Sequence, residues 1–100
     1  MAYERLYSKL TKENLWLYLL RTLIERPDYA LSLKRRVESR FGFKTAAITF
    51  YFVLYRLESD KMVISSKVSG KRVYSCTEKG REELGKALGL IEELGKRLKF

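Results

Sequence analysis

The sequence predicts a mostly α-helical domain with one small β-hairpin, and three observations predict it. Residues 61–77, KMVISSKVSGKRVYSCT, hold two short strand-like runs joined by Ser69-Gly70, a pair suited to a tight turn. Lys67, Lys71 and Arg72 flank that turn. Amphipathic helical patterns lie on both sides of the hairpin. This order of elements is that of a winged helix-turn-helix domain, although a hairpin that only caps a helical core is an alternative.

The charge of the chain favours a polyanionic partner. Lys and Arg number 21 against 12 acids, which gives a net charge of +9 on only 100 residues, enough for one domain with one core. The excess is gathered into two clusters, as expected of a binding face. One cluster spans residues 61–81, and the other consists of Lys34, Arg35, Arg36, Arg40 and Lys44.

The first helices form the hydrophobic centre. Residues 1–10 are mixed in character and fit a short helix or an arm. Thr11 is a plausible N-cap for a helix that ends near Arg26, because Pro27 disfavours helical geometry in the residue before it. Apolar residues occupy one face of this helix, and Trp16 and Tyr18 widen that face almost all the way round. The helix is therefore expected to be central in the domain or buried by a partner chain.

A second helix is predicted over Tyr29–Phe41, with Asp28 as its cap and Gly42 as its stop. Lys34, Arg35 and Arg36 lie on its polar side. Such a run is usually a solvated face, and the alternative is contact with phosphate, for which Arg35 is our candidate.

A third helix is predicted from Lys44 to about Ser59, with Thr45 as its N-cap. Phe50, Val53, Leu54 and Leu57 make a face suited to the core, while Ile48, Phe52 and Tyr55 make a second apolar stripe. If this helix enters a major groove, that stripe could contact thymine methyl groups, or it could pack on a dimer partner or a ligand. The polar candidates for DNA contact near its start are Lys44, Thr45, Thr49 and Tyr51.

The last helix follows the hairpin and is expected to serve dimerisation. Thr77 is placed to cap it, and a long apolar stripe runs along it to the C-terminus. A second copy of the chain is the simplest cover for that stripe, and an intrachain core is the alternative. The expected dimer residues are Leu84, Leu88, Ile91, Leu94, Leu98 and Trp16.

Several chemistries are not supported by the sequence, and we expect no enzyme, no cofactor and no metal. There is no histidine, no GxxxxGK[ST] loop and no GxGxxG motif. The single cysteine, Cys76, is expected to be a buried small hydrophobe and not a redox sensor. The longest uncharged run, Thr45–Tyr55, is too short to span a bilayer, and the N-terminus lacks an apolar signal core. We therefore expect a cytoplasmic protein.

Two motifs resemble those of the PadR-like winged-helix transcriptional regulators. The stretch ITFYFVLYRLE is similar to the family's G-T-L-Y-P-x-L-x-R-L-E recognition helix, with matches at Thr49, Tyr51, Leu54, Leu57 and Glu58. YSCTEKG is similar to its Y-x-L-T-x-x-G stretch, with matches at Tyr74, Thr77 and Gly80. The resemblance covers roughly residues 12–98. The family's glycine and proline in the recognition helix are replaced here by Ile48 and Phe52, which makes the expected reading surface more apolar.

The resemblance implies a homodimer that binds a near-palindromic site on double-stranded DNA and represses transcription. It divides the single structural domain into a DNA-binding part, residues 1–76, and a dimerisation helix, residues 77–100. Lys67, Lys71, Arg72 and Lys44 would contact phosphate. Some relatives respond to aromatic or cationic ligands, for which Trp16 and Tyr18 are candidates, and the alternative for both residues is packing in the core or the dimer. One alternative is a winged-helix protein-interaction module without specific DNA binding, and a weaker one is binding to an anionic membrane surface.

Overall fold

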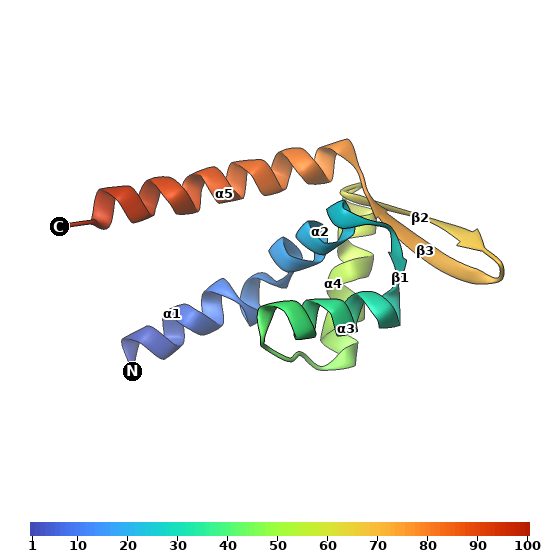
Figure 1. The fold of residues 1–100 in the computed structure, drawn as a ribbon, viewed down its shortest axis with the longest axis horizontal. Helices are drawn as coiled ribbons and strands as arrows, with labels where there is room; N and C mark the ends of the chain where they lie inside the picture. The colour runs from blue at the N-terminus through green and yellow to red at the C-terminus, as the bar shows by residue number, and fades with distance from the viewer.

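The structure is a computed structural model that describes all of residues 1–100. It is mostly helical with one small antiparallel sheet, as predicted (Figure 1). Its elements in chain order are α1 (Ala2–Leu10), the 3-10 helix η1 (Lys12–Asn14), α2 (Leu15–Glu25), β1 (Asp28–Tyr29), α3 (Ala30–Phe41), α4 (Ala47–Ser59), β2 (Val63–Val68), β3 (Lys71–Cys76) and α5 (Glu78–Leu98).

The hydrophobic core lies between α2, α3, α4 and the sheet, and α2 is at its centre. Leu19 and Leu20 of α2 are fully buried, and Phe50 and Leu54 of α4 pack into the same cluster. The prediction that Phe50, Leu54 and Leu57 face the core is therefore confirmed. Val53 is partly buried beside them.

The predicted hairpin is confirmed and belongs to a larger sheet. β2 and β3 pair antiparallel, and Ser69 and Gly70 at the turn both have positive φ angles, 50° and 80°. This is the backbone conformation of a type I′ turn, which matches the twist of the two strands. The short strand β1 pairs with β3 and gives the sheet order β1-β3-β2. Two residues beside Pro27 are too short a run to be recognised as a strand in the sequence.

Three of the predicted helix caps are wrong. The Thr11 hydroxyl donates to the carbonyl of Tyr7, so Thr11 closes α1, and α2 begins only at Leu15. Asp28 lies in β1, and Tyr29 precedes α3 without a side-chain cap. α4 begins at Ala47 after Ala46, so Thr45 lies outside that helix. Thr11 bonds back to the preceding turn, Asp28 pairs with Arg36, and the buried Thr45 hydroxyl has no hydrogen-bond partner, so each has the chemistry of a cap without its position.

A close contact fixes the root of α5 to the start of the hairpin. Thr77 caps α5 as predicted, because its hydroxyl accepts from the Gly80 amide at 3.2 Å. The same hydroxyl donates to the Lys61 carbonyl at 2.7 Å, and the Thr77 amide donates to the Met62 carbonyl at 3.0 Å. A Cβ atom at position 80 would collide with the Met62 carbonyl oxygen and lie 2.8 Å from the Cys76 sulfur. Only glycine fits there.

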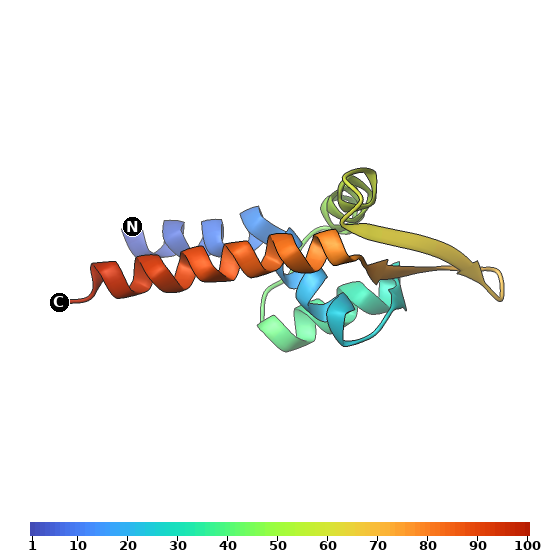
Figure 2. The ribbon, with the colours of Figure 1, turned by 90° about the horizontal axis from the view of Figure 1, so that it is seen from above.

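Two helical arms extend from this body on the side opposite the hairpin (Figures 1 and 2). α1 buries no residue, and in α5 only Gly80 and Leu84 are buried. The molecule is accordingly elongated, with extents of 53 × 27 × 21 Å. None of its helices combines the length and the hydrophobicity that crossing a bilayer requires.

Candidate nucleic-acid interface

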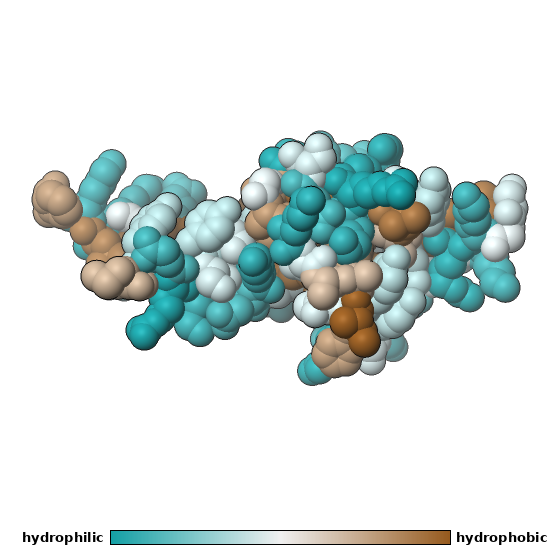
Figure 3. Space-filling view, turned by 90° about the horizontal axis from the view of Figure 1, so that it is seen from below, coloured by the Kyte–Doolittle hydropathy of each residue, from teal (hydrophilic) through white to brown (hydrophobic).

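The outer face of α4 is an exposed hydrophobic surface. Ile48, Phe52 and Tyr55 are 80%, 66% and 53% exposed, and each lies about one helical turn from the next. Figure 3 shows the result as a hydrophobic protrusion over α4, with mostly hydrophilic surface around it. The half-buried Tyr51 stacks on Tyr55 with the ring centroids 6.4 Å apart. The stripe predicted from the sequence therefore faces solvent and not the core of the same chain.

The residues before α4 divide into exposed and inward-facing groups. Lys44 and Thr49 are exposed, and Lys44 makes no hydrogen bond or ion pair. The Thr45 hydroxyl is buried without a hydrogen-bond partner, while its amide donates to the Glu38 carboxylate at 3.3 Å. The ion pair with Lys34 lowers the pKa of Glu38 against the opposing effect of desolvation, and the Thr45 amide lowers it further. Thr45 thus serves the connection between α3 and α4 and presents no hydroxyl to a ligand.

We use "wing" for β2, β3 and their turn. Its three predicted cations are exposed. Lys67 pairs across the strands with Arg72, on the sheet face that also holds Val63 and Tyr74 of the core. Arg72 donates to the Ser65 hydroxyl at 3.0 Å, and the Lys71 ammonium lies 4.6 Å from the centre of the Tyr29 ring. No carboxylate pairs with any of these three cations.

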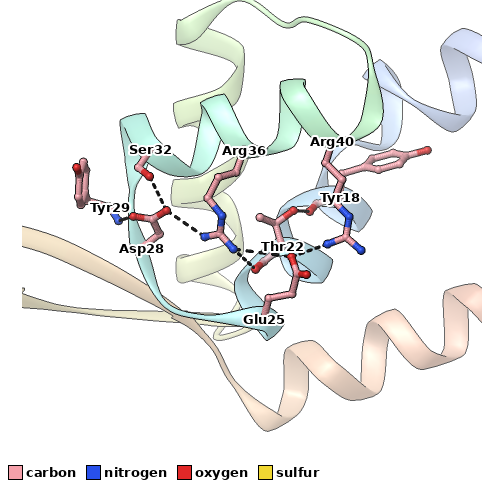
Figure 4. Close-up of polar contacts among 8 residues, drawn as sticks. All are labelled: Tyr18, Thr22, Glu25, Asp28, Tyr29, Ser32, Arg36 and Arg40. Atoms are coloured by element: carbon pink, nitrogen blue, oxygen red, sulfur yellow. Dashed lines mark hydrogen bonds and ion pairs between the residues drawn. The ribbon is translucent and has the colours of Figure 1, made fainter.

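The cations of α3 are different, because most of them are neutralised within the chain (Figure 4). Arg36 donates to the Asp28 carboxylate at 3.0 Å and to the Thr22 carbonyl at 3.1 Å. Arg40 pairs with Glu25, and Lys34 pairs with Glu38 at 2.8 Å. Arg35 has no such partner and lines a shallow polar depression together with residues of α2. The pairs made by Arg36 and Arg40 were not predicted, because Asp28 and Glu25 lie 8 and 15 residues away from them in the sequence.

Asp28 is the buried anchor of this network. Burial alone would raise the pKa of its carboxyl group, but hydrogen bonds from Ser32, Arg36 and the Tyr29 amide lower it below the usual value. The carboxylate is therefore held in its charged form. Asp28 also lies opposite Tyr74 in the sheet, so the ion pair ties α3 to the wing.

A second hydrophobic surface runs along α5. Leu88, Ile91, Leu94 and Leu98 are exposed in the single chain, whereas Leu84 is only 4% exposed and packs within the core. An apolar groove between α2 and α5 continues this surface and is lined by Leu17, Tyr18, Leu88 and Ile91, among others. The four distal residues remain candidates for contact with a partner, and Leu84 belongs to the chain's own core.

Trp16 does not lie on that surface. It lines a pocket of about 280 Å³ together with Phe52, Val53, Leu57 and Met62, and three charged residues surround the pocket. Tyr18, the other ligand candidate, donates its hydroxyl to the Leu10 carbonyl, and its ring packs against Phe41 and Phe43. Tyr18 is thus engaged in the fold, and Trp16 is the better placed of the two for a ligand.

Cys76 has the environment of a packing residue and not of a reactive thiol. It is partly buried at the end of β3, where desolvation raises the pKa of its thiol, so little of it is thiolate at neutral pH. Its sulfur borders the position that Gly80 occupies.

Comparisons with known proteins bear on this arrangement. The profile of the family described as "Transcriptional regulator PadR-like family" matches residues 19–86. A PadR family transcriptional regulator from Eggerthella lenta is similar in structure, with 27% identity, a TM-score of 0.74, and coverage of 99% of this chain and 97% of that one. No match to the sequence was found among curated proteins.

Two more distant structures share the fold. A transcriptional regulator from Clostridium thermocellum has 19% identity and a TM-score of 0.79, with 91% of this chain and 92% of that one covered. F93 from STIV, a winged-helix DNA-binding protein, also has 19% identity, with a TM-score of 0.72 and coverage of 84% and 92%. The winged-helix architecture predicted from the hairpin and its flanking helices is confirmed.

Proposed function

This chain belongs to the PadR-like family of transcriptional regulators, and from that premise we propose that it binds DNA as a homodimer and represses transcription. It is a winged-helix DNA-binding regulator and not an enzyme, as the sequence led us to expect. One observation carries the finer proposal. The exposed face of α4 is accompanied by cations without carboxylate partners, Lys44 near its start and the wing residues on the adjoining sheet.

In the proposed complex α4 enters the major groove, and the wing lies along the flanking backbone or minor groove. Lys44, Lys67, Lys71 and Arg72 contact phosphates, which supply most of the affinity without reading sequence. Thr49 and Tyr51 lie near base edges. Arg35 is a peripheral phosphate contact, because it lines the depression beside α2.

The proposed dimer is formed by the arms. Leu88, Ile91, Leu94 and Leu98 would pack against a second α5 in a coiled-coil-like seam, and the groove between α2 and α5 continues that surface. α1 has an exposed apolar side of its own, with Tyr3, Leu6, Tyr7 and Leu10, and it extends in the same general direction as α5. A symmetric dimer would cover both arms and place two α4 helices to read two half-sites.

A dimer seated on a promoter excludes other proteins from the same DNA, and this is the physical basis for proposing repression. We place its action in the cytoplasm.

The pocket beside Trp16 is where a small aromatic effector would bind. Because Trp16 is the only tryptophan, quenching of its fluorescence by a bound aromatic compound would report occupancy directly.

The test is DNA binding by fluorescence anisotropy on random duplexes over a salt series, with the mass in solution measured by light scattering. We expect a dimer whose log affinity falls linearly with log salt concentration, because phosphate binding releases counterions. A protein without duplex affinity at low salt would contradict the proposal and would favour the protein-interaction module, with the α4 stripe as its contact surface.

A paired substitution tests the dimer. Leu94→Glu places a charge on the exposed apolar side of α5 and should give a folded monomer with much weaker DNA binding. Gly89→Glu adds the same charge to the same helix where nothing lies within 4 Å, and it should leave the dimer intact. If Leu94→Glu remained dimeric, the proposed seam would be wrong.

A further inference from the structure

We infer that α4 recognises DNA through the 5-methyl groups of thymines, with Ile48 and Phe52 as the reading side chains. This inference rests on the proposed function, since it specifies what the α4 face contacts in the major groove. Its first support is that α4 has almost none of the side chains that usually read purine bases.

The α4 sequence, AITFYFVLYRLES, contains no Asn, Gln or Lys. Those residues, with Arg, make the bidentate hydrogen bonds that distinguish adenine and guanine in the major groove. The only such side chain on α4 is Arg56, which lies near the end of the helix and pairs with Asp60 at 3.5 Å. Direct reading of purines therefore has almost no donors available on this helix.

What the helix offers in their place is hydrophobic surface. Ile48 and Phe52 are the two most exposed large hydrophobic side chains of α4, one turn apart near the end that would enter the groove. The thymine 5-methyl is the apolar group that DNA presents in the major groove, and apolar side chains contact it. The exposed apolar side chains of α4 therefore suit contact with this apolar methyl group.

The surroundings of the stripe favour DNA over a protein partner. Lys44 precedes the helix, and Lys67 and Arg72 lie on the adjoining sheet, so cations accompany the hydrophobic residues. The two nearby carboxylates already have partners within the chain: Glu58 accepts a hydrogen bond from the Ser65 hydroxyl, and Asp60 forms an ion pair with Arg56. The hydrophobic side chains can contact methyl groups in the major groove, and the cations beside them can contact the phosphates on either side of that groove.

The experiment compares one duplex with and without its thymine methyl groups. The tightest duplex is first selected from a random 30-base-pair pool and then resynthesised with deoxyuridine replacing every thymine, which removes only the methyl groups. We expect the selected sequence to carry thymines in each half-site. We expect the deoxyuridine duplex to bind about fourfold more weakly for each methyl group that α4 buries.

Variants assign the effect to α4. Ile48→Ala with Phe52→Ala should bind the two duplexes with nearly equal affinity, and both positions are exposed, so the core is unaffected. Ile64→Ala removes a similarly exposed apolar side chain from the sheet face away from α4 and should keep the full preference for thymine.

The outcomes separate this inference from the proposed function. Equal affinity of the wild-type protein for the thymine and deoxyuridine duplexes, or a selected site without thymines, would overturn methyl reading and leave DNA binding intact. A preference that survives in the double variant would also overturn it. A pool from which no sequence is enriched would contradict sequence-specific DNA binding itself.

Discussion

The two clusters of cations look alike in the sequence but differ in the folded chain. In α3, Arg36, Arg40 and Lys34 are each paired with a carboxylate of the same chain. In the wing, Lys67, Lys71 and Arg72 have none. A local excess of charge therefore does not identify a binding surface, because carboxylates distant in sequence can neutralise it.

The difference has an energetic meaning. A partly buried arginine that holds two elements together contributes to stability, whereas an exposed lysine contributes little to stability and is free to bind phosphate. The α3 cluster should thus affect folding, and the wing should affect binding. Four predictions test this division, from the largest expected effect to the smallest.

Asp28→Ala should lower the free energy of unfolding by about 2–3 kcal/mol, because it removes three hydrogen bonds, one of them to a charged partner of low exposure. Chemical denaturation at neutral pH measures the loss. Glu92→Ala breaks an exposed pair with Lys96 and should change stability by less than about 0.5 kcal/mol. Equal effects of the two substitutions would show that Asp28 is no anchor.

Acid should protonate the carboxylates that pair with the α3 cations and so reduce stability, whereas the wing cations have no carboxylate partner to lose. The pKa values of Asp28 and Glu38 are lowered in the folded state, so the stability they contribute is complete above the unfolded pKa of about 4 and is lost as the pH falls through the folded values. Unfolding free energy measured at pH 7 and at pH 3 should therefore fall less in Asp28→Asn than in the wild type. An identical fall in both would refute the assignment.

Lys71→Ala with Arg72→Ala should weaken binding to all duplexes by about tenfold or more at 0.1 M salt and reduce the salt slope by about 0.9 for each lost phosphate contact. Stability should be nearly unchanged. The matched control is Lys96→Ala with Arg97→Ala, which removes the same charge from exposed positions of α5. If the control weakened binding as much as the wing variant, net charge and not the wing would explain the affinity.

Arg35→Ala tests the boundary between the two clusters, because Arg35 is the α3 cation without a partner. We expect the smallest effect here, about a twofold loss of affinity, as for one weak phosphate contact at the periphery. Titration of a random duplex at low salt measures it. A loss as large as that of the wing variant would make α3 part of the central interface.

Much of the fold could be predicted from the sequence where the signal was local. The hairpin turn at Ser69-Gly70, the cap at Thr77 and the helix stop at Gly42 each depend on one or two residues with strong backbone preferences. The two faces of α4 followed from helical periodicity alone.

The remaining features depend on contacts between distant residues. Asp28 has the chemistry of an N-cap, yet its ion pair with Arg36 holds it elsewhere, while Thr11 bonds back to the Tyr7 carbonyl and Thr45 precedes the first turn of α4. For the same reason the sequence could not show that Arg36 is paired and Arg35 is not, because their partners depend on how α2 meets α3. Leu84 likewise looked like the first residue of the dimer stripe and lies in the core.

The joint at Thr77 and Gly80 has a mechanical consequence. Two hydrogen bonds of Thr77 and the close approach of Gly80 to Met62 tie the root of α5 to the start of the hairpin, so a rotation of α5 there would also displace the hairpin. With 21 residues, α5 is a lever arm about 30 Å long. In the proposed dimer, a change in the crossing angle of two such levers would alter the distance between the two α4 helices. That distance must match the helical repeat of DNA, about 34 Å. A rotation of α5 at the dimer contact, far from the DNA, would therefore change the affinity for DNA.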